Sequence, residues 1–574
     1  MSISRVDTDV KSTAFYKYHQ MTKHTVQKLR ASNYRLDWAN QPNPFLQFEG
    51  APAVDLPRSS FRTSNLNFFE TLMAMVSGWN GAPLADDVET VVDVAEFVSN
   101  LLYGGMAISA WKQVVGTDHR WALRVNASSG NLHPTDTAVL IREDSEKLQA
   151  GLYHYRADEH RLDKRTSGDL VTPLVEFLGL DCEAPPVVLC LSSTFFREAW
   201  KYRDRAFRYC QHDMGHALAA LTLSAAVLGW TSRVVAAFPD DEVARFLGME
   251  GLLQKPMAFV LLARAGQLVP VSDSAEFAVG AAGELPDGKF AGTPNKLTTR
   301  VIEYESIDRV YDATKYEAWR AREVLIEGAT ASGGDEDSAG GLPGPIVACA
   351  EEVSISGEFE VDCRQSSVHQ TIRERRSAVD MDGKTTMDAA HLGAILRAAT
   401  FGFAADFQGV DATGGGEWQA STNHLVHLYL YVHRVVGLEP GLYFFNRFEG
   451  KLVPLLQSDQ RETAMSTSCF QEIAADGAFS ISMIADFERG YQLYGERCYR
   501  LVHYEAGYIG QMLYLSAAAL GYDATGIGCF LDDAINNYLG LYDGREVIYN
   551  FTIGKAVVDA RLTTLSAYDF PTPY

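Results

Sequence analysis

Several features that would assign a simple role are missing from this 574-residue sequence. No stretch approaches the roughly 18 consecutive apolar residues that can cross a membrane, and Met1 to Gln20 lack the apolar segment of a secretory signal. Basic residues are also few, because 50 Lys and Arg stand against 73 Asp and Glu, a formal net charge of -23. Acidic surfaces repel nucleic acid and anionic membranes, so the charge disfavours both as partners. We therefore expect a cytoplasmic protein that is either a small-molecule enzyme or a protein-binding module.

Metal and disulfide motifs are missing as well. The eight cysteines include no Cys-x-x-Cys pair, and there is no His-Glu-x-x-His sequence. Four histidines that draw attention, His133, His154, His212 and His216, do not have metal-ligand spacing. We expect reduced thiols in apolar surroundings and no metal site. The composition, 47% hydrophobic and 21% charged, is that of an ordinary globular protein.

What the sequence does contain is an internal repeat. Tyr202 to Gly248 aligns without a gap onto Tyr494 to Gly540 at a constant offset of 292 residues. Identical pairs include Arg205/Arg497, Arg208/Arg500, Gly215/Gly507, Ser224/Ser516, Gly229/Gly521, Phe238/Phe530 and Asp240-Asp241/Asp532-Asp533. There are only two units, each of well over 200 residues, which is far too long for a solenoid repeat. The repeat indicates two fused homologous domains that imitate a homodimer.

The chain divides at its one low-complexity segment, residues 327–345, which is rich in glycine and acidic residues and predicts a flexible linker. Domain one then covers 1–290, with an N-terminal extension, 1–70, that has no counterpart and either wraps the other domain or covers the pocket. A connector and the linker follow over 291–345, and domain two covers 346–574.

Each domain shows the same order of elements: a helix, two strands, a long Ala/Leu helix and a final strand. We expect them at 86–107, 137–142, 152–155, 211–229 and 257–263, and again at 387–403, 425–433, 442–445, 503–521 and 547–553. This pattern predicts an α+β fold with a central, mostly antiparallel sheet flanked by helices in each domain. The long helices carry Ser-Ala-Ala at 224–226 and 516–518, which allows close approach, so they are candidates for the seam of an intramolecular pseudo-dimer.

Three short segments have the chemistry to bind an anionic, planar cofactor. Arg375-Arg376-Ser377 offers two guanidinium groups and a hydroxyl, although the same residues suit a solvated helix start. Ser128-Ser129-Gly130-Asn131 is a loop of small donors that lets backbone amides approach a ligand, or an ordinary turn. Gly526-Ile527-Gly528 offers backbone N–H groups but lacks the third glycine of a dinucleotide fingerprint.

Further motifs are Ser-Gly-Asn-Leu-His-Pro at 129–134, Gly-Leu-Tyr-His-Tyr at 151–155, and Lys201-Tyr202 followed by Arg205 and Arg208-Tyr209. Together with the three segments, they resemble the FMN-dependent nitroreductase superfamily and, more narrowly, its SagB/McbC-type (ThcOx) dehydrogenase branch. In that family one subunit gives FMN an Arg-Arg-Ser segment, a Gly-x-Gly segment and a basic residue, and its partner gives the Ser-Ser-Gly-Asn loop. The resemblance implies FMN held by Arg375, Arg376, Ser377, Gly526, Ile527, Gly528 and Lys555 together with Ser128, Ser129, Gly130 and Asn131.

The reciprocal site does not have these elements. It would need arginines near Trp79 to Ala82, glycines at Val234 and Ala236, and a Ser-Gly-Asn loop at 418–421, and the sequence has none of them. Selection to keep one site leaves such a mutually exclusive pattern. We therefore expect one FMN per chain, between the domains.

The resemblance also implies a catalytic pair. In the azoline-oxidising members of the branch, a Lys-Tyr pair is implicated in removing a substrate proton as hydride passes to FMN, which corresponds here to Lys201 and Tyr202. Domain two has Leu493 in place of the lysine. The alternatives are that Lys201 caps a surface turn and that Tyr202 is structural. Arg205 and Arg208, shared between the domains, are expected to be architectural, with pairing to Asp213 and Glu505 inside each domain.

Three functions remain open from the sequence. The first is an FMN oxidoreductase that dehydrogenates a small or peptide-borne substrate, such as an azoline-type heterocycle. The second is a reductase that takes electrons from NAD(P)H to nitro, quinone or enone acceptors. The third is an inactive scaffold subunit of a modifying complex. Oligomerisation beyond the pseudo-dimer is also open.

Overall fold

The computed structural model describes residues 9–32, 34–57, 66–79, 90–180, 182–264, 267, 289–316, 349–355, 367–408, 424–542 and 544–569. The predicted linker 327–345 and the segment 418–421 lie outside these ranges. Within the described part, no helix is long and apolar enough to cross a membrane.

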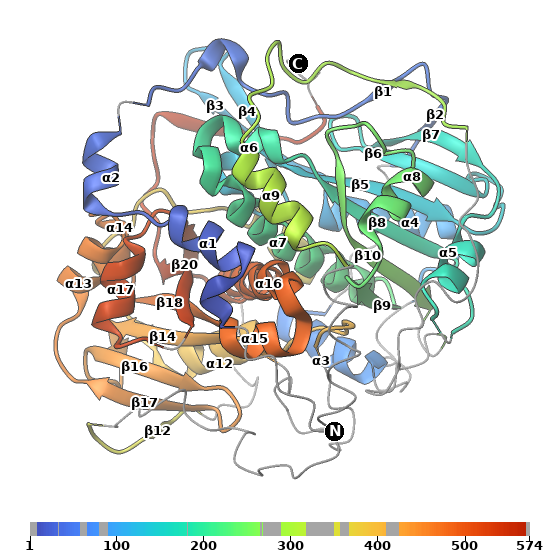
Figure 1. Cartoon of the computed structure of the whole chain (residues 1–574). Coiled ribbons are helices and arrows are strands. Elements are labelled where there is room, and N and C mark those ends of the chain that lie inside the picture. The colour runs from blue at the N-terminus through green and yellow to red at the C-terminus, as the bar shows by residue number, and fades with distance from the viewer. Residues whose placement is uncertain are drawn as a thin grey trace, which may run out of the picture.

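Two seven-stranded sheets with the same strand order form the framework of the molecule (Figure 1). The first has the order β2-β7-β6-β5-β8-β10-β9, with β2 Ala53–Asp55, β5 Thr135–Ile141, β6 Gly151–Arg156, β7 Arg161–Ser167, β8 Val187–Ser193, β9 Trp230–Val235 and β10 Lys255–Arg264. The second has the order β12-β17-β16-β14-β18-β20-β19, with β12 Val353–Ser354, β14 Val426–Val432, β16 Gly441–Asn446, β17 Lys451–Leu456, β18 Phe479–Asp486, β19 Asp523–Ile527 and β20 Arg545–Gly554. Neighbouring strands in both sheets are antiparallel. The predicted α+β fold with two homologous domains is confirmed.

The seam between the domains is formed by the two long helices, α7 (Ala206–Val227) and α16 (Cys498–Ala519), which lie together in the middle of the molecule (Figure 1). They cross at Gly215 and Gly507, where a Cβ atom on either glycine would collide with the backbone of the other helix. The prediction that these helices form the seam is confirmed, and the small residues at this crossing are the two glycines. Ser224, in the first Ser-Ala-Ala segment, packs against Gly104 of α4 (Val94–Gly105). Only glycine lets two backbones come as close as those of α7 and α16 at Gly215 and Gly507.

Shorter elements surround this framework. The other helices of the described part are α1 Ala14–Met21, α2 Val26–Ala31, α3 Phe68–Trp79, α5 Val171–Phe177, α6 Phe195–Tyr202, α8 Asp240–Phe246, α9 Glu305–Ala313, α11 Val368–Glu374, α12 Ala389–Thr400, α13 Arg461–Thr467, α14 Ile473–Asp476, α15 Phe487–Tyr494 and α17 Asp532–Tyr538. Two small sheets pair β1 (Phe48–Glu49) with β11 (Thr293–Pro294) and β13 (Met387–Asp388) with β15 (Val435–Val436). In a third, β3 (Ile108–Val114) lies between β21 (Leu562–Leu565) and β4 (Arg120–Arg124).

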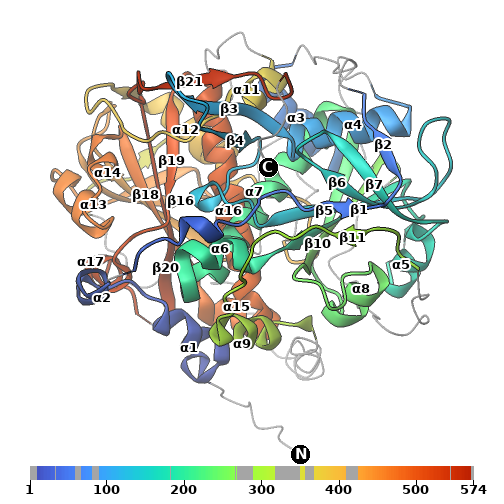
Figure 2. The same cartoon turned by 90° about the horizontal axis from the view of Figure 1, so that it is seen from above.

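Described residues near both ends of the chain contact the other domain. At the N-terminal end, the ring of Phe15 in α1 packs on Phe487 and Tyr499 of domain two, with ring centroids 5.4 and 5.5 Å apart. At the C-terminal end, β21 adds an antiparallel strand to β3 of domain one (Figure 2), and the indole of Trp111 donates to the carbonyl of Ala567 at 2.7 Å. The first helix of the N-terminal extension therefore wraps the partner domain, one of the two roles expected for it.

The shared arginines also connect the domains. Arg205 and Arg208 both bind Asp532 at the start of α17, at 3.1 and 2.9 Å. At the equivalent positions, Arg497 and Arg500 bind Asp240 at 2.9 and 2.6 Å. Because each arginine lies near the start of its long helix, it reaches the short helix of the other domain. This reciprocal pairing reproduces the interface of a symmetric dimer.

The expectation that these arginines pair with Asp213 and Glu505 inside each domain was wrong. Asp213 accepts hydrogen bonds from Ser128 and Ser129, and Glu505 binds Arg447 at 2.9 Å. The two carboxylates thus already have partners within their own domains.

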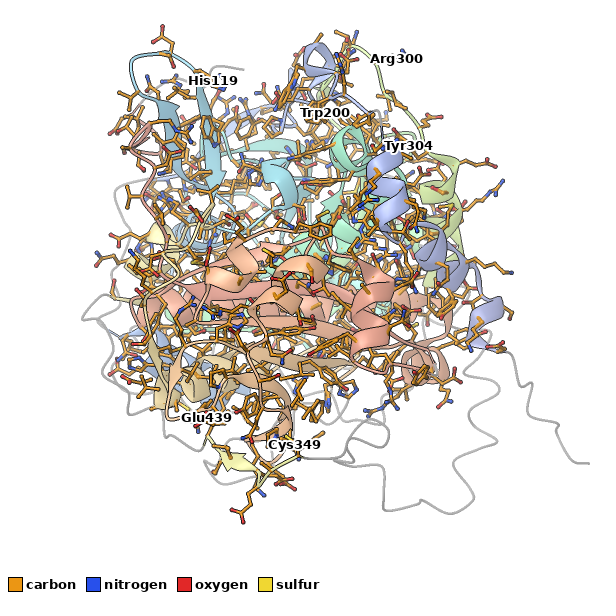
Figure 3. The ribbon with its side chains drawn as sticks, turned by 90° about the vertical axis from the view of Figure 1, so that its left-hand side faces the viewer. His119, Trp200, Arg300, Tyr304, Cys349 and Glu439 are labelled. Carbon is orange, nitrogen blue, oxygen red and sulfur yellow. The ribbon has the colours of Figure 1, made fainter. Side chains whose placement is uncertain are left out.

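The cysteines differ widely in exposure. Cys190, Cys210 and Cys498 are buried, as expected for core thiols. Cys349 is exposed and lies at the opposite end of the molecule from Trp200 (Figure 3). Cys469 and Cys529 are half-buried and close together.

Candidate functional site

A cavity of 740 Å³ between the two domains brings most of the predicted site residues together. Its volume lies within the roughly 300–1,000 Å³ that is usual for ligand pockets. The predicted residues that line it are Ser128, Ser129, Gly130, Asn131, Lys201, Tyr202, Arg375, Arg376, Ser377, Gly526, Ile527 and Gly528. Lys555 is not among its described lining residues. Its ammonium binds the carboxylate of Asp523 at 2.9 Å and the carbonyl of Gly521 at 3.1 Å.

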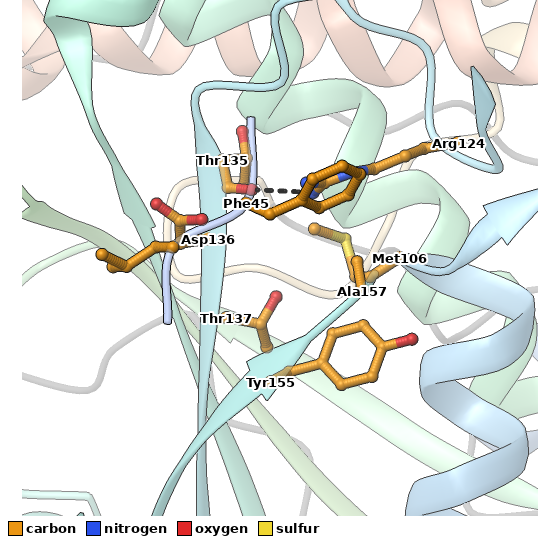
Figure 4. A pocket seen from close by; sticks show the side chains of 9 residues that line it. Phe45, Met106, Arg124, Thr135, Asp136, Thr137, Tyr155 and Ala157 are labelled. Atoms are coloured by element: carbon orange, nitrogen blue, oxygen red, sulfur yellow. Dashed lines mark hydrogen bonds between the residues drawn. The ribbon is translucent and has the colours of Figure 1, made fainter. Parts of the chain in front are cut away.

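A second, much smaller pocket lies next to the cavity, and Arg124 lines both (Figure 4). Its volume is 10 Å³, about enough for one water molecule, so it does not compete as a cofactor site. The Arg124 guanidinium donates to the carbonyls of Pro44 and Thr135, at 2.7 and 3.5 Å. Burial lowers the pKa of Arg124 to about 10, and these bonds anchor the strand that leads to the Ser128–Asn131 loop.

The cavity is strongly basic in a chain that is strongly acidic. Among the described residues, its walls hold no Asp or Glu, and the basic side chains there are Lys112, Arg124, Lys201, Arg203, Arg205, Arg375 and Arg376. Clustered positive charge with low-dielectric walls focuses the field on anions. Planar guanidinium groups are also well suited to a phosphate. The cavity therefore favours an anionic ligand.

The Ser128–Asn131 loop is held in shape by Asp213 of α7. The Asp213 carboxylate accepts from the Ser128 hydroxyl at 2.6 Å and from the backbone N–H and hydroxyl of Ser129, each at 2.9 Å. Burial raises the pKa of Asp213 to about 7, and the serine hydrogen bonds oppose that rise. The Asn131 amide is also engaged by the protein, because it donates to the Ala122 carbonyl at 2.8 Å and faces His133 Nε2 at 2.9 Å.

Lys201 and Tyr202 end helix α6 and touch this loop at Gly130. A Cβ atom on Gly130 would lie 2.5 Å from the Tyr202 hydroxyl and 2.9 Å from the Lys201 ammonium. Gly130 also has a positive φ of 59°, which favours glycine. Lys201 is half-buried in the cavity wall. Burial, with nearby Glu198, holds the pKa of Tyr202 well above its usual value, so its hydroxyl stays protonated.

Tyr209 links this pair to the glycine segment of the other domain. Its ring lies 4.6 Å from the Tyr202 ring, and its hydroxyl donates to the Gly528 carbonyl at 2.9 Å. Arg205, whose partner is Asp532, donates to the same hydroxyl at 3.0 Å. The interface ion pair therefore also fixes the position of the cavity wall.

In domain two, the Arg-Arg-Ser and Gly-x-Gly segments form one unit. Ser377 bridges to Ala524 and shares a hydrogen bond of 2.8 Å with the Tyr514 hydroxyl. That hydroxyl accepts from the Gly526 N–H at 2.9 Å. Burial, together with neighbouring Arg375, lowers the pKa of Arg376 to about 10.

Several buried polar atoms at the cavity have no partner in the described part of the chain. Arg375 donates to the carbonyls of Val125 and Arg124, each at 3.0 Å, but its Nη1 atom has no acceptor. Asn126 Oδ1 and His133 Nδ1 are likewise unpartnered, and both residues line the cavity. Buried polar groups are normally satisfied. These atoms therefore fit a ligand that carries both acceptors and donors.

Sequence reasoning missed several wall residues, among them Tyr209, His216, Tyr514 and Tyr549. The repeat carried a signal for three of them, because the residues at the equivalent positions of the two copies differ. In the alignment, Tyr209 corresponds to Leu501, His216 to Tyr508 and Tyr514 to Thr222. His216 contacts Gln511 and the Tyr549 hydroxyl, each at 3.1 Å. Residues that differ between the two copies thus gather around the cavity.

On the other side of the pseudo-dimer, described residues of the two domains contact each other at the twin of the cavity's glycine segment. Val234 and Ala236 stand where domain two has Gly526 and Gly528, and Val234 bridges to Ala405 of domain two. The Asp406 carboxylate accepts from the N–H groups of Ala236 and Ala237, at 2.8 and 2.7 Å. Burial raises the pKa of Asp406 to about 6.

An aromatic stack closes the same cleft. The ring of Phe403 lies 4.1 Å from that of Tyr508 and nearly parallel to it. Tyr508 is the counterpart of His216 in the open cavity. Protein side chains thus occupy the positions that remain open in the other cleft.

Comparison with known proteins agrees with the two-domain description. The Nitroreductase family model matches twice, over residues 85–264 and 372–555. The trifolitoxin-processing protein TfxB of Rhizobium leguminosarum bv. trifolii is 24% identical over 269 residues, which cover 45% of this chain and 67% of that protein. A protein of Methanocaldococcus jannaschii named as a nitroreductase is 29% identical over 120 residues, 21% of this chain but only 61% of that protein.

A solved structure extends the likeness to the whole fold. A nitroreductase from Anabaena variabilis superposes with a TM-score of 0.69 at 23% identity and covers 95% of this chain and 100% of its own. The two family matches together span more than half of the sequence, and each contains most of one seven-stranded sheet. This protein therefore belongs to the Nitroreductase family, with two copies of the family's domain in one chain.

Proposed function

We propose that this nitroreductase-family oxidoreductase binds one FMN in the cavity between its domains and dehydrogenates a small or peptide-borne substrate there. The family usually binds FMN. The observation that carries the proposal is the cavity itself, where seven basic side chains, no described acidic ones and the free Nη1 of Arg375 face one space. That donor set suits a phosphate and the polar edge of a flavin.

The residues would divide the binding between the two domains. Arg375 and Arg376 would supply charge-assisted hydrogen bonds, and Gly526 to Gly528 would let the backbone approach a planar ring. The Ser128–Asn131 loop, fixed by Asp213, would close the ligand from the domain-one side. When bound, FMN supplies the acceptor for a hydride.

Lys201 and Tyr202 would carry out the proton chemistry. Both line the cavity, and both contact Gly130. The Lys201 amine would accept a proton from the substrate atom next to the carbon that loses hydride, so that a double bond forms between the two atoms, and the protonated Tyr202 hydroxyl would orient the reacting group. Domain two has Leu493 at the aligned position, so only one such base is available per pseudo-dimer.

The choice of a dehydrogenase draws on the relatives. TfxB, by its name, processes trifolitoxin, and it aligns over 45% of this chain. A substrate of the azoline type, a heterocycle on a peptide that loses two electrons and two protons to become aromatic, is consistent with a base beside a flavin.

The first experiment counts the cofactor. Titration of the purified full chain with FMN, followed by flavin fluorescence, is expected to saturate at about one FMN per chain. Saturation near two would contradict the single-site proposal. A protein that takes up no FMN would support the inactive scaffold.

The second experiment assigns the base and the direction of electron flow. Lys201→Ala is expected to retain FMN but to lose anaerobic flavin reduction by azoline-bearing peptides. Lys112→Ala removes a charge from the same cavity wall, so it is expected to bind FMN less tightly yet still be reduced. Equal activity in Lys201→Ala and the wild type would remove the catalytic assignment. Rapid bleaching by NADPH, with no response to azolines, would instead favour the reductase.

A further inference from the structure

Cys469 and Cys529 meet in the wall of the cavity although 60 positions separate them in the sequence. Their sulfur atoms are 2.6 Å apart, closer than two sulfurs that merely touch, and a disulfide bond measures about 2.0 Å. Cys529 directly follows Gly528 and lines the cavity. Cys469 is not among the described lining residues, and its neighbour Phe470 is 59% exposed. The pair therefore spans the wall from the cavity to the outer surface.

Hydrogen bonds hold the two segments in this arrangement. The N–H of Leu531 donates to the Thr467 carbonyl at 2.7 Å, and the Gln471 amide donates to the Cys529 carbonyl at 3.0 Å. Cys469 and Phe470 both have positive φ, 56° and 61°. Such a conformation costs energy in residues other than glycine and persists only where the surroundings enforce it. The turn is thus built to direct Cys469 toward Cys529.

The surroundings make the two thiols unequal. The hydrogen bond with Cys469 lowers the pKa of the Cys529 thiol to about 5, and neighbouring His24 and Arg205 act in the same direction. The bond with Cys529 and burial raise the pKa of Cys469. At neutral pH the pair shares one proton, and Cys529 is the thiolate. A thiolate is both the reactive nucleophile and the better leaving group in disulfide exchange.

We propose that Cys469 and Cys529 form a reversible disulfide that carries electrons between the flavin in the cavity and an external dithiol. The relay rests on the proposed function, because it needs FMN in that cavity. It identifies the chemical class of an electron partner for this site, a dithiol or its disulfide. The chain needs no nucleotide-binding motif to recognise such a partner.

The electron balance of the relay is complete. A thiolate of the external dithiol attacks Cys469 Sγ, Cys529 leaves as a thiolate, and the second external thiol then releases Cys469 as the external disulfide forms. The reduced pair, one thiol and one thiolate, loses two electrons and its single proton as its S–S bond forms again, and oxidised flavin would take up the electrons and the proton. In this direction, the one that dithiothreitol drives, external dithiol and oxidised flavin become external disulfide and reduced flavin. In turnover of the proposed dehydrogenase the same steps run in reverse, so that an external disulfide accepts the two electrons that the substrate has given to the flavin.

A metal site is the competing use of these residues. The ligand atoms of His24, Cys469 and Cys529 all lie within 4.8 Å of one another. Two thiolates at about 2.3 Å from a tetrahedral zinc ion would be about 3.8 Å apart. The observed 2.6 Å is much shorter, so the geometry favours the covalent pair over shared coordination of an ion.

The linkage is tested without reference to activity. Full-length protein is treated with diamide, alkylated under denaturing conditions and digested, and the peptides are analysed by mass spectrometry. We expect a reducible cross-link between the peptides of Cys469 and Cys529 in the wild type and in Cys349→Ser, whose cysteine is exposed and distant. Loss of the cross-link is expected in Cys469→Ser. Stoichiometric zinc that disappears in Cys469→Ser and Cys529→Ser, with no cross-link, would overturn the proposal.

The relay itself is tested by anaerobic bleaching of the visible flavin band with dithiothreitol. Bleaching is expected to be at least about tenfold slower in Cys469→Ser and Cys529→Ser than in the wild type and Cys349→Ser, whereas dithionite bleaches all four. Cys469→Ala, with its thermal stability measured, serves if the serine variant does not fold. Equal rates in all FMN-loaded variants would refute the relay alone. Failure of the wild type to bind FMN would remove the proposed function and the relay together, even with the cross-link present.

Discussion

The two clefts of the pseudo-dimer occupy equivalent positions and have opposite contents. One is an open basic cavity with Gly526 and Gly528 in its wall. In the other, the N–H groups of Ala236 and Ala237 are bound by Asp406. Backbone donors that lose a ligand must find another acceptor, and a carboxylate of the same chain supplies it here. The comparison teaches that, among the described residues, a carboxylate of the chain binds the backbone donors in one cleft whose counterparts line the open cavity in the other.

The ion pairs and the helix crossing that join the domains remain symmetric. Asp240 and Asp532 each bind two arginines of the other domain, and Gly215 meets Gly507 at the helix crossing. The two domains therefore share their means of association and differ in their chemistry.

The largest effect is expected from breaking this symmetric pairing. Asp532→Ala and Asp240→Ala each leave two buried guanidinium groups without a counter-charge, so each should lower the free energy of unfolding by about 3–5 kcal/mol. Asp532→Ala should also weaken FMN binding, because Arg205 holds Tyr209 against Gly528. Urea unfolding and FMN titration of both variants measure this. Equal FMN affinity in the two variants would show that the ion pair does not support the cavity.

The next effect concerns the contact between the Ser128–Asn131 loop and the proposed catalytic pair, Lys201 and Tyr202. Gly130→Ala places a methyl group against Tyr202 and Lys201, so substrate-driven flavin reduction should fall by about 100-fold through misplacement. Gly50→Ala is a matched control, because Gly50 also has a positive φ but nothing within 4 Å of its Cβ position. Stopped-flow flavin reduction compares them. Similar rates in both variants would mean that only backbone strain matters.

A smaller loss is expected from a single cationic contact. Arg376→Ala should weaken FMN binding by about 1.5–3 kcal/mol, the usual value of a hydrogen bond to a charged group. Arg373→Ala in the preceding helix is the control, since Arg373 packs on Tyr103 and is not among the described residues that line the cavity. Equilibrium titration gives both affinities, and an unchanged affinity in Arg376→Ala would exclude this residue from the site.

The smallest effect belongs to the filled cleft. Burial raises the pKa of Asp406 to about 6, so the folded protein holds this proton more tightly than the unfolded chain does. The resulting stability is present below about pH 4 and is lost as the pH rises to about 6. Because Asp406 is half-buried, solvent screening reduces the difference to about 1–2 kcal/mol.

Asp406→Asn removes this titration. Unfolding of the variant should be less sensitive to pH between about 4 and 6 than that of the wild type, and its FMN affinity should not change. Calorimetric unfolding across the pH range provides the measurement. Parallel curves for the two proteins would show that Asp406 has an ordinary pKa.

Much of the fold was predictable because its signals are local and duplicated. The long helices, expected at 211–229 and 503–521, were found at Ala206–Val227 and Cys498–Ala519, because apolar periodicity marks a helix well and its exact ends poorly. The segments of the cavity carried short motifs of donors and glycines. Lys555 was predicted as a site residue only from its charge and its place near a strand, and in the structure its ammonium binds Asp523.

The remaining features depend on residues far apart in the sequence. From the sequence, Asp213 was expected to pair with arginines on the basis of charge, but charge alone does not identify a partner. In the structure its carboxylate accepts hydrogen bonds from Ser128 and Ser129. Nothing in the spacing of Cys469 and Cys529 indicates that their sulfurs meet.

The sequence by itself determined that the chain contains two homologous domains and that only one complete set of the Arg-Arg-Ser, Gly-x-Gly and Ser-Ser-Gly-Asn segments occurs in it. These properties are written in local composition and in the repeat, which need no coordinates. Only the tertiary structure decided which charges pair across the seam, what fills the twin cleft and where the cysteines meet. Such contacts join residues up to several hundred positions apart, and their partners are selected by packing in three dimensions.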